Sequence, residues 1–559
     1  MFSSRQNVNT LTALLVSHGI RHAVVCPGSR NAPIVHNFNE CEDITCYPVT
    51  DERSAGFVAL GIAQHTDQPV AVCVTSGSAL LNLAPAVAEA SYQHQSLIVI
   101  SADRPEAWID QLDGQTILQP GALSHWVAKT VVLPENDRWY ANRLVNEALI
   151  AATDVSHACV HINVPVSEPL FLFDKPELPD ERIIRCFAPA ADYDCLPQAL
   201  VDGLYNAERP LIIFGQCSPR RFFYEGVDNL FSRVIVLHEA LAPFTSVSHF
   251  DEVLSAVNGL ALGDELLPDF ILYVGDAIVS KRLKAFLRRA TGAITWRVST
   301  GGKVEDTFQN LSGILVGDVE SMLKSLSNKL FKRKFNICPS SLQFRRQWLK
   351  VLSLASNHRQ TFHPAYSQMA AVSQFEDMLH QVAYSYEVHY ANSTAVRLAN
   401  IYAHHPVWCN RGVNGIEGSL STAVGFSLAA QEAMVFCVIG DLSFFYDQNA
   451  LWNQQLRGCS NLRILLLNNG KGGIFDQLKG LEQSPARDVF VAGQHVTTAQ
   501  GICQQNQVEY HAAHDDDSLC LGLDRLLRPQ ADSSILLEVF TSASQDAAEY
   551  QRYFRELKL

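Results

Sequence analysis

The sequence predicts an α/β fold made of three doubly wound domains, each built around a parallel β-sheet. Short runs rich in β-branched and apolar residues alternate with longer segments of helical periodicity along the chain. Such alternation is typical of βαβ units, in which parallel strands are covered by helices on both faces. The runs expected to form strands lie at 22–29, 69–78, 96–105, 158–165, 209–215, 233–239, 269–275, 406–410, 433–441, 463–469 and 533–540.

Two polar segments mark the boundaries between the predicted domains. A chain of 559 residues is too long for one hydrophobic core, because single domains usually hold roughly 100–200 residues. The proline-containing, charged segments 173–182 and 332–341 are therefore predicted to be linkers. The resulting domains are 1–180, 181–340 and 341–559.

The composition is that of an ordinary globular protein, with 47% hydrophobic and 18% charged residues. A net charge of -14 argues against a surface for nucleic acid or anionic membranes and favours small molecules as partners. The cysteines show no CxxC spacing, and Cys26, Cys73 and Cys437 lie in apolar runs, so we expect buried thiols. The N-terminal stretch does not resemble a secretory leader, and no apolar run approaches about 18 residues. We therefore expect a cytoplasmic protein.

A Gly-Asp pair after one predicted strand and an Asn-Asn pair after the next predict a metal and diphosphate site. The run VIGD ends at Asp441, and Asn468 and Asn469 follow the apolar run ILLL about thirty residues later. Ligands of open α/β sheets bind at the carboxyl ends of strands, and glycines after Asn469 let the backbone approach a phosphate. Magnesium prefers oxygen ligands, which Asp441, Asn469 and the backbone carbonyl of Lys471 can supply.

A Gly-Asp pair alone is most often a simple turn at a strand end. The chain has three others, at 263–264, 275–276 and 317–318, but only the pair at 440–441 precedes Asn-Asn, the sole such dipeptide. The sequence holds neither the P-loop pattern GxxxxGK[ST] nor GxGxxG between a strand and a helix. The sequence therefore gives no sign of these two other kinds of phosphate-binding site.

This Gly-Asp to Asn-Asn spacing resembles the signature of thiamine-diphosphate-dependent enzymes. The resemblance implies an N-terminal pyrimidine-binding domain, a central domain and a C-terminal diphosphate-binding domain. It implies that Glu52, in TDERSAG, hydrogen-bonds N1′ of the cofactor, although a glutamate in a first helical turn also complements the helix dipole. Because Glu52 and Asp441 lie in different domains, it also implies a homodimer or a dimer of dimers with active sites between subunits.

The same resemblance implies roles for further residues. Glu52 and Gln115 are expected to be catalytic, with Gln115 near the reacting centre. The metal, Mg²⁺ or Mn²⁺, is expected on Asp441, Asn469 and Lys471. The residues expected to bind thiamine diphosphate are Glu52, Thr75, Gly77, Ser393, Ile416, Gly440, Asp441, Leu442, Ser443, Asn469, Lys471, Gly473 and Ile474. Ile416 would support the bent shape of the cofactor, or would otherwise be an ordinary core residue.

Basic residues gather in the loops expected to face the cofactor. They are Arg30, Arg104, Lys281, Arg282, Arg397 and Arg411. Arginine binds carboxylates bidentately, so several in one site predict polyanionic substrates, although any one alone more often pairs with a surface acid. Ten motifs occur in order, namely PGSRNAP, TDERSAG, VTSGSALLNL, SADRP, GQTILQPG, SKRL, NSTAVRL, NRGVNGIEG, GDLSFFYD and GGIF. Together they resemble the branch of the family that works in menaquinone biosynthesis, over essentially the whole chain.

That branch implies decarboxylation of 2-oxoglutarate and 1,4-addition of the resulting succinyl carbanion equivalent to isochorismate. Both substrates are dicarboxylates, which agrees with the arginines. The residues expected to bind substrate are Ser29, Arg30, Arg104, Gln115, Lys281, Arg282, Ser393, Arg397, Arg411, Ile474, Phe475 and Leu478. The last three would form an apolar wall and a mobile loop.

Two positions depart from the family pattern, and two other functions remain open. Gly114 stands where asparagine is expected, and Lys471 replaces the commoner glycine whose carbonyl binds metal. The nearest alternative is a simple 2-oxo-acid decarboxylase or an acetolactate-type synthase, whose smaller substrates need fewer arginines. The other is a catalytically silent homologue, against which the retained Glu52, Asp441 and Asn469 argue.

Overall fold

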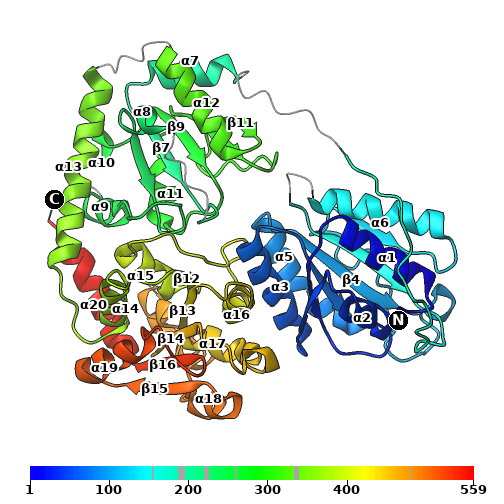
Figure 1. Ribbon diagram of the computed structural model, residues 1–559. Coiled ribbons are helices and arrows are strands. Elements are labelled where there is room, and N and C mark those ends of the chain that lie inside the picture. The colour runs from blue at the N-terminus through cyan, green and yellow to red at the C-terminus, as the bar shows by residue number, and fades with distance from the viewer. Residues whose placement is uncertain are drawn as a thin grey trace.

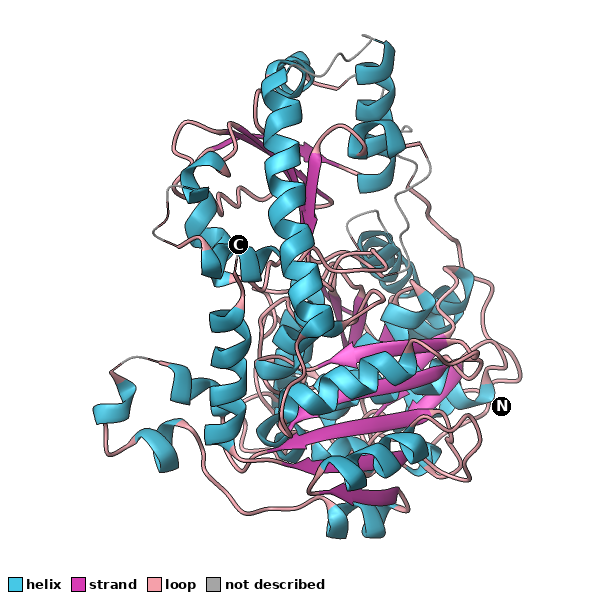
Figure 2. Ribbon diagram, turned by 90° about the vertical axis from the view of Figure 1, so that its left-hand side faces the viewer, coloured by secondary structure: helices cyan, strands magenta, loops and turns pink. Residues whose placement is uncertain are grey.

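Three separate parallel β-sheets with flanking helices confirm the predicted fold class (Figures 1 and 2). The computed structural model describes residues 1–153, 157–186, 196–219, 226–258, 260, 262–332, 339–478 and 480–558. Among these residues, no helix has both the length and the apolar composition that a membrane span requires.

The first sheet has six parallel strands in the order β2-β1-β3-β4-β6-β5. Its strands are β1 (His22–Val25), β2 (Thr45–Pro48), β3 (Val70–Val74), β4 (Leu97–Asp103), β5 (Lys129–Val132) and β6 (Val160–Pro165). Its helices are α1 (Gln6–Ser17), α2 (Ala32–Glu40), α3 (Glu52–Thr66), α4 (Ser78–Asn82), α5 (Ala84–Tyr92) and α6 (Arg138–Thr153).

Alternate residues of these strands enter two different hydrophobic cores. Val72 and Val99 belong to the core on one face, whereas Cys73 and Ile98 belong to the core on the other. Successive side chains of a strand point to opposite faces, so both faces are covered by helices, as a doubly wound sheet requires. The buried, free thiols of Cys26, Cys73 and Cys437 agree with the sequence prediction.

The central sheet has five parallel strands in the order β11-β10-β9-β7-β8. They are β7 (Pro210–Phe214), β8 (Ile235–His238), β9 (Phe270–Val274), β10 (Ile294–Ser299) and β11 (Leu311–Val316). Its helices are α7 (Gln198–Asn206), α8 (Asp228–Phe231), α9 (Phe250–Ala256), α10 (Leu262–Glu265), α11 (Lys281–Leu287), α12 (Val319–Lys332) and α13 (Pro339–Thr361).

The third sheet has five parallel strands in the order β12-β13-β14-β16-β15. They are β12 (Tyr386–Tyr390), β13 (Met434–Gly440), β14 (Leu462–Asn468), β15 (Glu509–Ala513) and β16 (Ile535–Phe540). Its helices are α14 (Gln368–Leu379), α15 (Thr394–Tyr402), α16 (Ser419–Ala429), α17 (Asp441–Tyr446), α18 (Gln500–Asn506), α19 (Asp516–Leu526) and α20 (Ala543–Glu556), with the 3-10 turn η5 (Gly473–Gln477).

The strand predicted at 406–410 is wrong. The chain runs beside β12 here, but it forms only a single parallel bridge, between His389 and Trp408. Two backbone hydrogen bonds join it to β12, from Tyr390 N to Trp408 O and from Trp408 N to Val388 O. The apolar residues of this run are buried because they cover the core. Their composition therefore resembles that of a β-strand, although the run lacks the ladder of hydrogen bonds that pairs two strands.

The two predicted linkers lie in different surroundings. Segment 173–182 packs on the first domain, where buried Glu181 accepts hydrogen bonds from Thr10 and Asn142, both at 2.8 Å. In the second linker, 333–338 lie outside the described residues. The helix that follows it, α13, places Trp348 in the core of the central domain and runs along that domain toward α20 (Figure 1). The central unit, as packed, therefore includes α13, and the boundary at 340/341 stays a prediction.

The first and third domains pack against each other through α3 and α16, which lie side by side (Figure 1). A Cβ atom on Gly61 would lie only 1.9 Å from the carbonyl oxygen of Thr422, and one on Gly425 only 2.0 Å from that of Val58. The missing side chains thus let the two helix backbones approach each other. One hydrophobic core runs continuously across this contact.

We predict that Gly61→Ala lowers the free energy of unfolding by about 1–3 kcal/mol, because the added methyl group overpacks the contact between α3 and α16. Urea unfolding followed by circular dichroism measures the change. The matched control is Gly501→Ala in α18, where an added Cβ meets no atom within 4 Å. Equal stability of the two variants would contradict the importance of this contact.

Candidate active site

The carboxylate of Asp441 joins the ends of two neighbouring strands of the third sheet. Asp441 directly follows β13 and is only 4% exposed. One of its oxygens accepts the backbone N–H of Leu442 at 2.7 Å. The other accepts those of Asn469 and Gly470, just after β14, at 3.1 and 2.8 Å. The structure thus brings Asp441 and Asn469 together at one edge of the sheet.

The side chain of Asn469 is oriented by Asp546 on α20. Asn469 Nδ2 donates to Asp546 Oδ2 at 2.9 Å, so Oδ1 of Asn469 is left facing the backbone N–H of Lys471 at 3.3 Å. Asp546 also accepts the N–H of Gln368 and the hydroxyl of Thr541, both at 2.8 Å. Sequence reasoning missed Asp546, since it lies 77 residues beyond Asn469 in a helix with a mostly polar sequence.

Lys471 anchors the loop that follows Asn469. Its Nζ lies 2.9 Å from Asp476 and 3.2 Å from Asp488. Next to it, Gly472 donates its backbone N–H to the carbonyl of Ala492 at 2.7 Å. The lysine side chain, at a position where the family more often has glycine, therefore adds salt bridges that hold the loop. The backbone carbonyl that is expected to bind metal is present whichever side chain stands here.

The other predicted cofactor residues of the third domain surround the same edge. Ser443 donates its hydroxyl to the carbonyl of Ile416, whose 43% exposed side chain is open to contact with a ligand. Ser393 precedes α15 with φ of 75°, and Gly440 and half-buried Leu442 flank Asp441. A Cβ atom on Gly473 would lie 2.9 Å from Asn469 Nδ2, so a larger residue here would shift the side chain of Asn469.

Glu52 begins α3 in the first domain. The preceding Asp51 caps the helix by accepting the N–H of Arg53 at 3.0 Å. Glu52 is half-buried, and its carboxylate accepts a hydrogen bond from Asn82 Nδ2 at 3.3 Å. The cap thus fixes where the glutamate side chain starts.

Thr75, Gly77 and Gln115 lie close to one another beyond the end of β3. Gly77 has φ of 86°, and a Cβ atom there would lie 3.1 Å from the backbone of Gln115, so glycine is required for two reasons. Gln115 itself has φ of 57° and is exposed. Thr75 is buried against Gly28, which carries the loop to Ser29. These residues therefore share one corner of the first domain.

Gln119, which sequence reasoning missed, supports this corner from beneath. It is fully buried, and its Oε1 accepts the N–H of Gly77 at 2.7 Å. Its Nε2 donates to Asn163 Oδ1 at 2.7 Å and to the carbonyl of Ala102 at 3.1 Å. The motif GQTILQPG contains it, but nothing in the residue types marks the second glutamine as the buried one.

Arg30 and Arg104 converge beside the same corner, next to exposed Ser29. Arg30 is buried and donates to the carbonyl of Val166 at 2.9 Å. Burial, followed by the positive charge of Arg104, lowers the pKa of Arg30. Arg104 Nε donates to the carbonyl of Gly114 at 3.2 Å. Gly114, the other position that departs from the family pattern, thus contacts Arg104 through its backbone. Glu168 pairs with Arg30 at 3.4 Å, but no carboxylate in the described part of the chain pairs with Arg104, so the two guanidinium groups still favour a bound anion.

A cavity of about 290 Å³ brings together five of the predicted substrate residues from two domains. These are Lys281, Arg282, Arg397, Ile474 and Leu478. Phe475 does not line this cavity, and its ring lies against Gly472 instead. The carboxylates of Asp251 and Glu252 also line it, but Asp251 pairs with Arg282 and Glu252 accepts a hydrogen bond from Tyr553. Lys281 and Arg397 remain as cations beside the apolar side chains, which suits a small carboxylic acid with an aliphatic part.

Arg411 lies near the first domain, where the backbone N–H of the next residue, Gly412, donates to Glu89 at 2.7 Å. Arg411 NH1 donates to Asn392 Oδ1 at 3.1 Å, whereas its Nε is buried without a hydrogen-bond partner. It lines a hollow that also holds Lys284 and Arg297. An unsatisfied donor in this position leaves capacity for a further acceptor.

The predicted site residues thus form two groups within one chain. The first-domain group contains Glu52 and its neighbours, and the other contains Asp441 and the cationic cavity. Among the described residues, no hydrogen bond or ion pair joins a predicted site residue of one group to one of the other. The separation agrees with the expectation that Glu52 and Asp441 belong to different domains.

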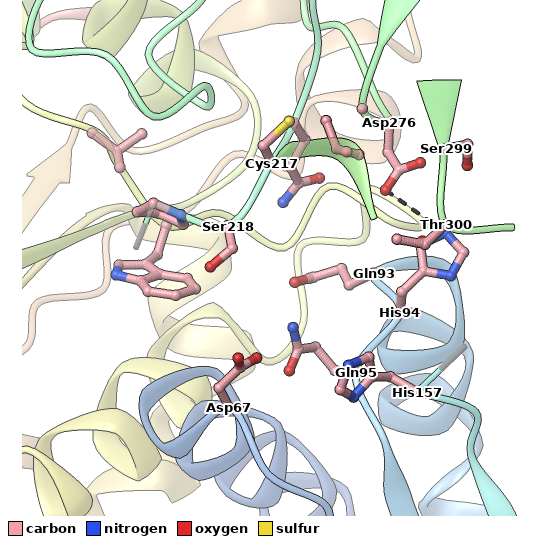
Figure 3. A pocket seen from close by; sticks show the side chains of 16 residues that line it. Asp67, Gln93, His94, Gln95, His157, Cys217, Ser218, Asp276, Ser299 and Thr300 are labelled. Atoms are coloured by element: carbon pink, nitrogen blue, oxygen red, sulfur yellow. Dashed lines mark ion pairs between the residues drawn. The ribbon is translucent and has the colours of Figure 1, made fainter. Parts of the chain in front are cut away.

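A different cavity lies where all three domains meet (Figure 3). His94 of the first domain faces Asp276 of the central domain, with 3.7 Å between Nε2 and Oδ2. Cys217, whose sulfur lies beside Gly275, and Ser218 also line it from the central domain, and Trp408 contributes from the third domain. None of the residues predicted for the active site lines it.

Two family descriptions match the outer domains. Residues 7–123 match the thiamine pyrophosphate enzyme N-terminal TPP binding domain, and residues 391–512 match the corresponding C-terminal TPP binding domain. Together with the three parallel sheets, these matches place the chain among the thiamine pyrophosphate enzymes.

Full-length relatives define the family more narrowly. A 2-succinyl-5-enolpyruvyl-6-hydroxy-3-cyclohexene-1-carboxylate (SEPHCHC) synthase of Bacteroides fragilis is 41% identical, with 100% of both chains covered. Synthases of the same name from Flavobacterium johnsoniae and Desulfotalea psychrophila are 34% and 33% identical, covering 96% and 97% of this chain and 96% and 99% of their own. The chain belongs to the SEPHCHC synthase family.

Proposed function

We propose that the chain joins 2-oxoglutarate to isochorismate with loss of CO₂ and forms SEPHCHC in menaquinone biosynthesis. The full-length similarity to synthases of that name carries the proposal. The protein would act as a thiamine-diphosphate-dependent transferase in the cytoplasm. Thiamine diphosphate, when bound, supplies an electron sink for decarboxylation and carbon–carbon bond formation.

The residues after β13 and β14 fit a metal-bound diphosphate. Buried Asp441 has no Lys or Arg within ion-pair distance among the described residues, and its nearest basic group is His495 Nε2 at 3.5 Å. Asp441, Asn469 Oδ1 and the carbonyl of Lys471 offer the oxygen ligands that Mg²⁺ or Mn²⁺ prefers. No cluster of three or more His, Cys, Asp or Glu occurs in the described ranges, and this ligand set requires none.

The cationic groups supply the proposed contacts with substrate. Arg30, Arg104, Lys281, Arg282, Arg397 and Arg411 would bind the carboxylates of the two substrates, together with Ser29 and Ser393. Ile474, Phe475 and Leu478 would provide apolar contacts. A simple 2-oxo-acid decarboxylase has one carboxylate to bind and would leave several of these cations unpaired, which disfavours that alternative.

Glu52 and Gln115 are the proposed catalytic residues, completed by a second copy of the chain. Glu52 would hold a proton shared with N1′ of the cofactor's pyrimidine ring, and Gln115 would orient the reacting groups. Within one chain, Glu52 contacts Asn82, whereas Asp441 contacts the loop after β14. We therefore infer a homodimer, alone or paired into a tetramer, with each site formed between two subunits.

The direct test mixes purified protein, thiamine diphosphate, Mg²⁺, 2-oxoglutarate and isochorismate, and follows the absorbance of isochorismate. We expect a loss of isochorismate that requires every component. Glu52→Gln is expected to abolish turnover while metal-dependent cofactor binding, measured by calorimetry, persists. No cofactor-dependent loss with the wild type, or full activity of the variant, would contradict the proposal.

Asp546 provides a second test, directed at metal-dependent binding. Asp546→Ala frees the amide of Asn469 to rotate away from the metal, so we expect about 10–100-fold weaker binding of thiamine diphosphate with Mg²⁺. Calorimetry measures this affinity. Asp524→Ala, at an exposed position on α19, is the matched control. Unchanged affinity in Asp546→Ala would remove this residue from the metal site.

A further inference from the structure

The C-terminal helix α20 lies against the candidate site along one face. Asp546, Tyr550 and Phe554 are spaced four residues apart, so they lie on the same side of the helix. Asp546 and Tyr550 line a small cavity beside Asn469, whereas Tyr550 and Phe554 line the 290 Å³ cavity. Tyr550 thus borders both cavities, and Arg397 is the other residue that does so.

Arg397 is a positively charged residue without an ion-pair partner among the described residues. It is half-buried on α15, and burial lowers its pKa. In the described part of the chain, no carboxylate lies within ion-pair distance of its guanidinium. Removing a charge from water without a paired partner is costly, so a bound carboxylate would stabilise this arrangement.

Arg282 on α11 lies at the same cavity and is held in place from two sides. Its NH1 pairs with Asp251, and its guanidinium stacks over the ring of Phe554 with 4.5 Å to the ring centroid. The side chain is 42% exposed, so part of its planar fork remains accessible. Arg282 and Arg397 therefore present two cations to one cavity.

Tyr550 lines the same cavity as these two cations. Burial lowers the pKa of Arg282, but the charge of Asp251 and then the nearby Tyr550 raise it overall. The ring of Tyr550 packs on Phe554 with centroids 5.0 Å apart. Burial raises the pKa of Tyr550 itself to about 12, so the phenol keeps its proton at neutral pH. A protonated phenol beside two guanidinium groups can donate a hydrogen bond to a carboxylate.

We propose that Tyr550 is a substrate-binding residue that donates a hydrogen bond to a carboxylate held between Arg282 and Arg397, and that it selects dicarboxylic 2-oxo acids. The apolar side of the cavity, with Ile401, Ile474 and Leu478, suits the methylene groups between the two carboxylates of such an acid. This inference rests on the proposed function and adds a specificity residue to it.

The test compares Tyr550→Phe with the wild type. We expect the KM for 2-oxoglutarate to rise about tenfold, which corresponds to about 1.4 kcal/mol, with kcat changed less than about twofold. Binding of thiamine diphosphate with Mg²⁺ should stay unchanged. Tyr384→Phe is the matched control, because it removes a phenol that donates to the carbonyl of Leu527, outside the residues lining either cavity.

A second measurement separates this inference from the proposed function. Calorimetry with 2-oxoglutarate and the cofactor-loaded protein should show about tenfold weaker binding to Tyr550→Phe. If the wild type does not turn over isochorismate, the proposed function fails, and this binding comparison still decides the role of Tyr550. Equal affinities, or an unchanged KM accompanied by a lower kcat, would overturn the inference.

Discussion

The carboxylate of Asp441 holds the loop after β14 against the end of β13. Three backbone N–H groups, of Leu442, Asn469 and Gly470, donate to its two oxygens, and the group is almost fully buried. Losing these acceptors would leave partly buried amides without these partners, at a cost of up to about 1–3 kcal/mol each. The orientation of Asn469 by Asp546 and the salt bridges of Lys471 act on a loop that Asp441 has already placed. The proposed metal and diphosphate site at this edge depends on that one side chain.

The same chain carries the other half of the proposed site on a separate sheet. Glycines in α3 and α16 allow the first and third domains to pack closely. Even so, no hydrogen bond or ion pair among the described residues connects Glu52 with Asp441. Cations are likewise divided, with Arg30 and Arg104 on one side and Arg282 and Arg397 on the other. Each half has charges or donors without full partners, as expected of surfaces completed by ligands and a second subunit.

Much of this was predictable from the sequence because strands and strand-end loops leave local patterns. The runs at 433–441 and 463–469 predicted β13 and β14, and their ends carried Asp441 and Asn469. The residues that distant segments of the chain contribute to the candidate site have no such local pattern. Asp546 and Tyr550 lie in a C-terminal helix whose contact with the site is tertiary, and Gln119 differs from Gln115 only in burial. The strand predicted at 406–410 failed because burial alone produces the same apolar run.

The claim that two copies of the chain share each site has a direct test in a hybrid dimer. One subunit carries Glu52→Gln, the other carries Asp441→Ala, and two different affinity tags isolate the mixed species. Sites between subunits leave one of the two intact, so the hybrid should show about half of the wild-type turnover, although neither variant is active alone. A hybrid without activity, from subunits that bind each other normally, would contradict the account, because each chain would then need both residues in itself.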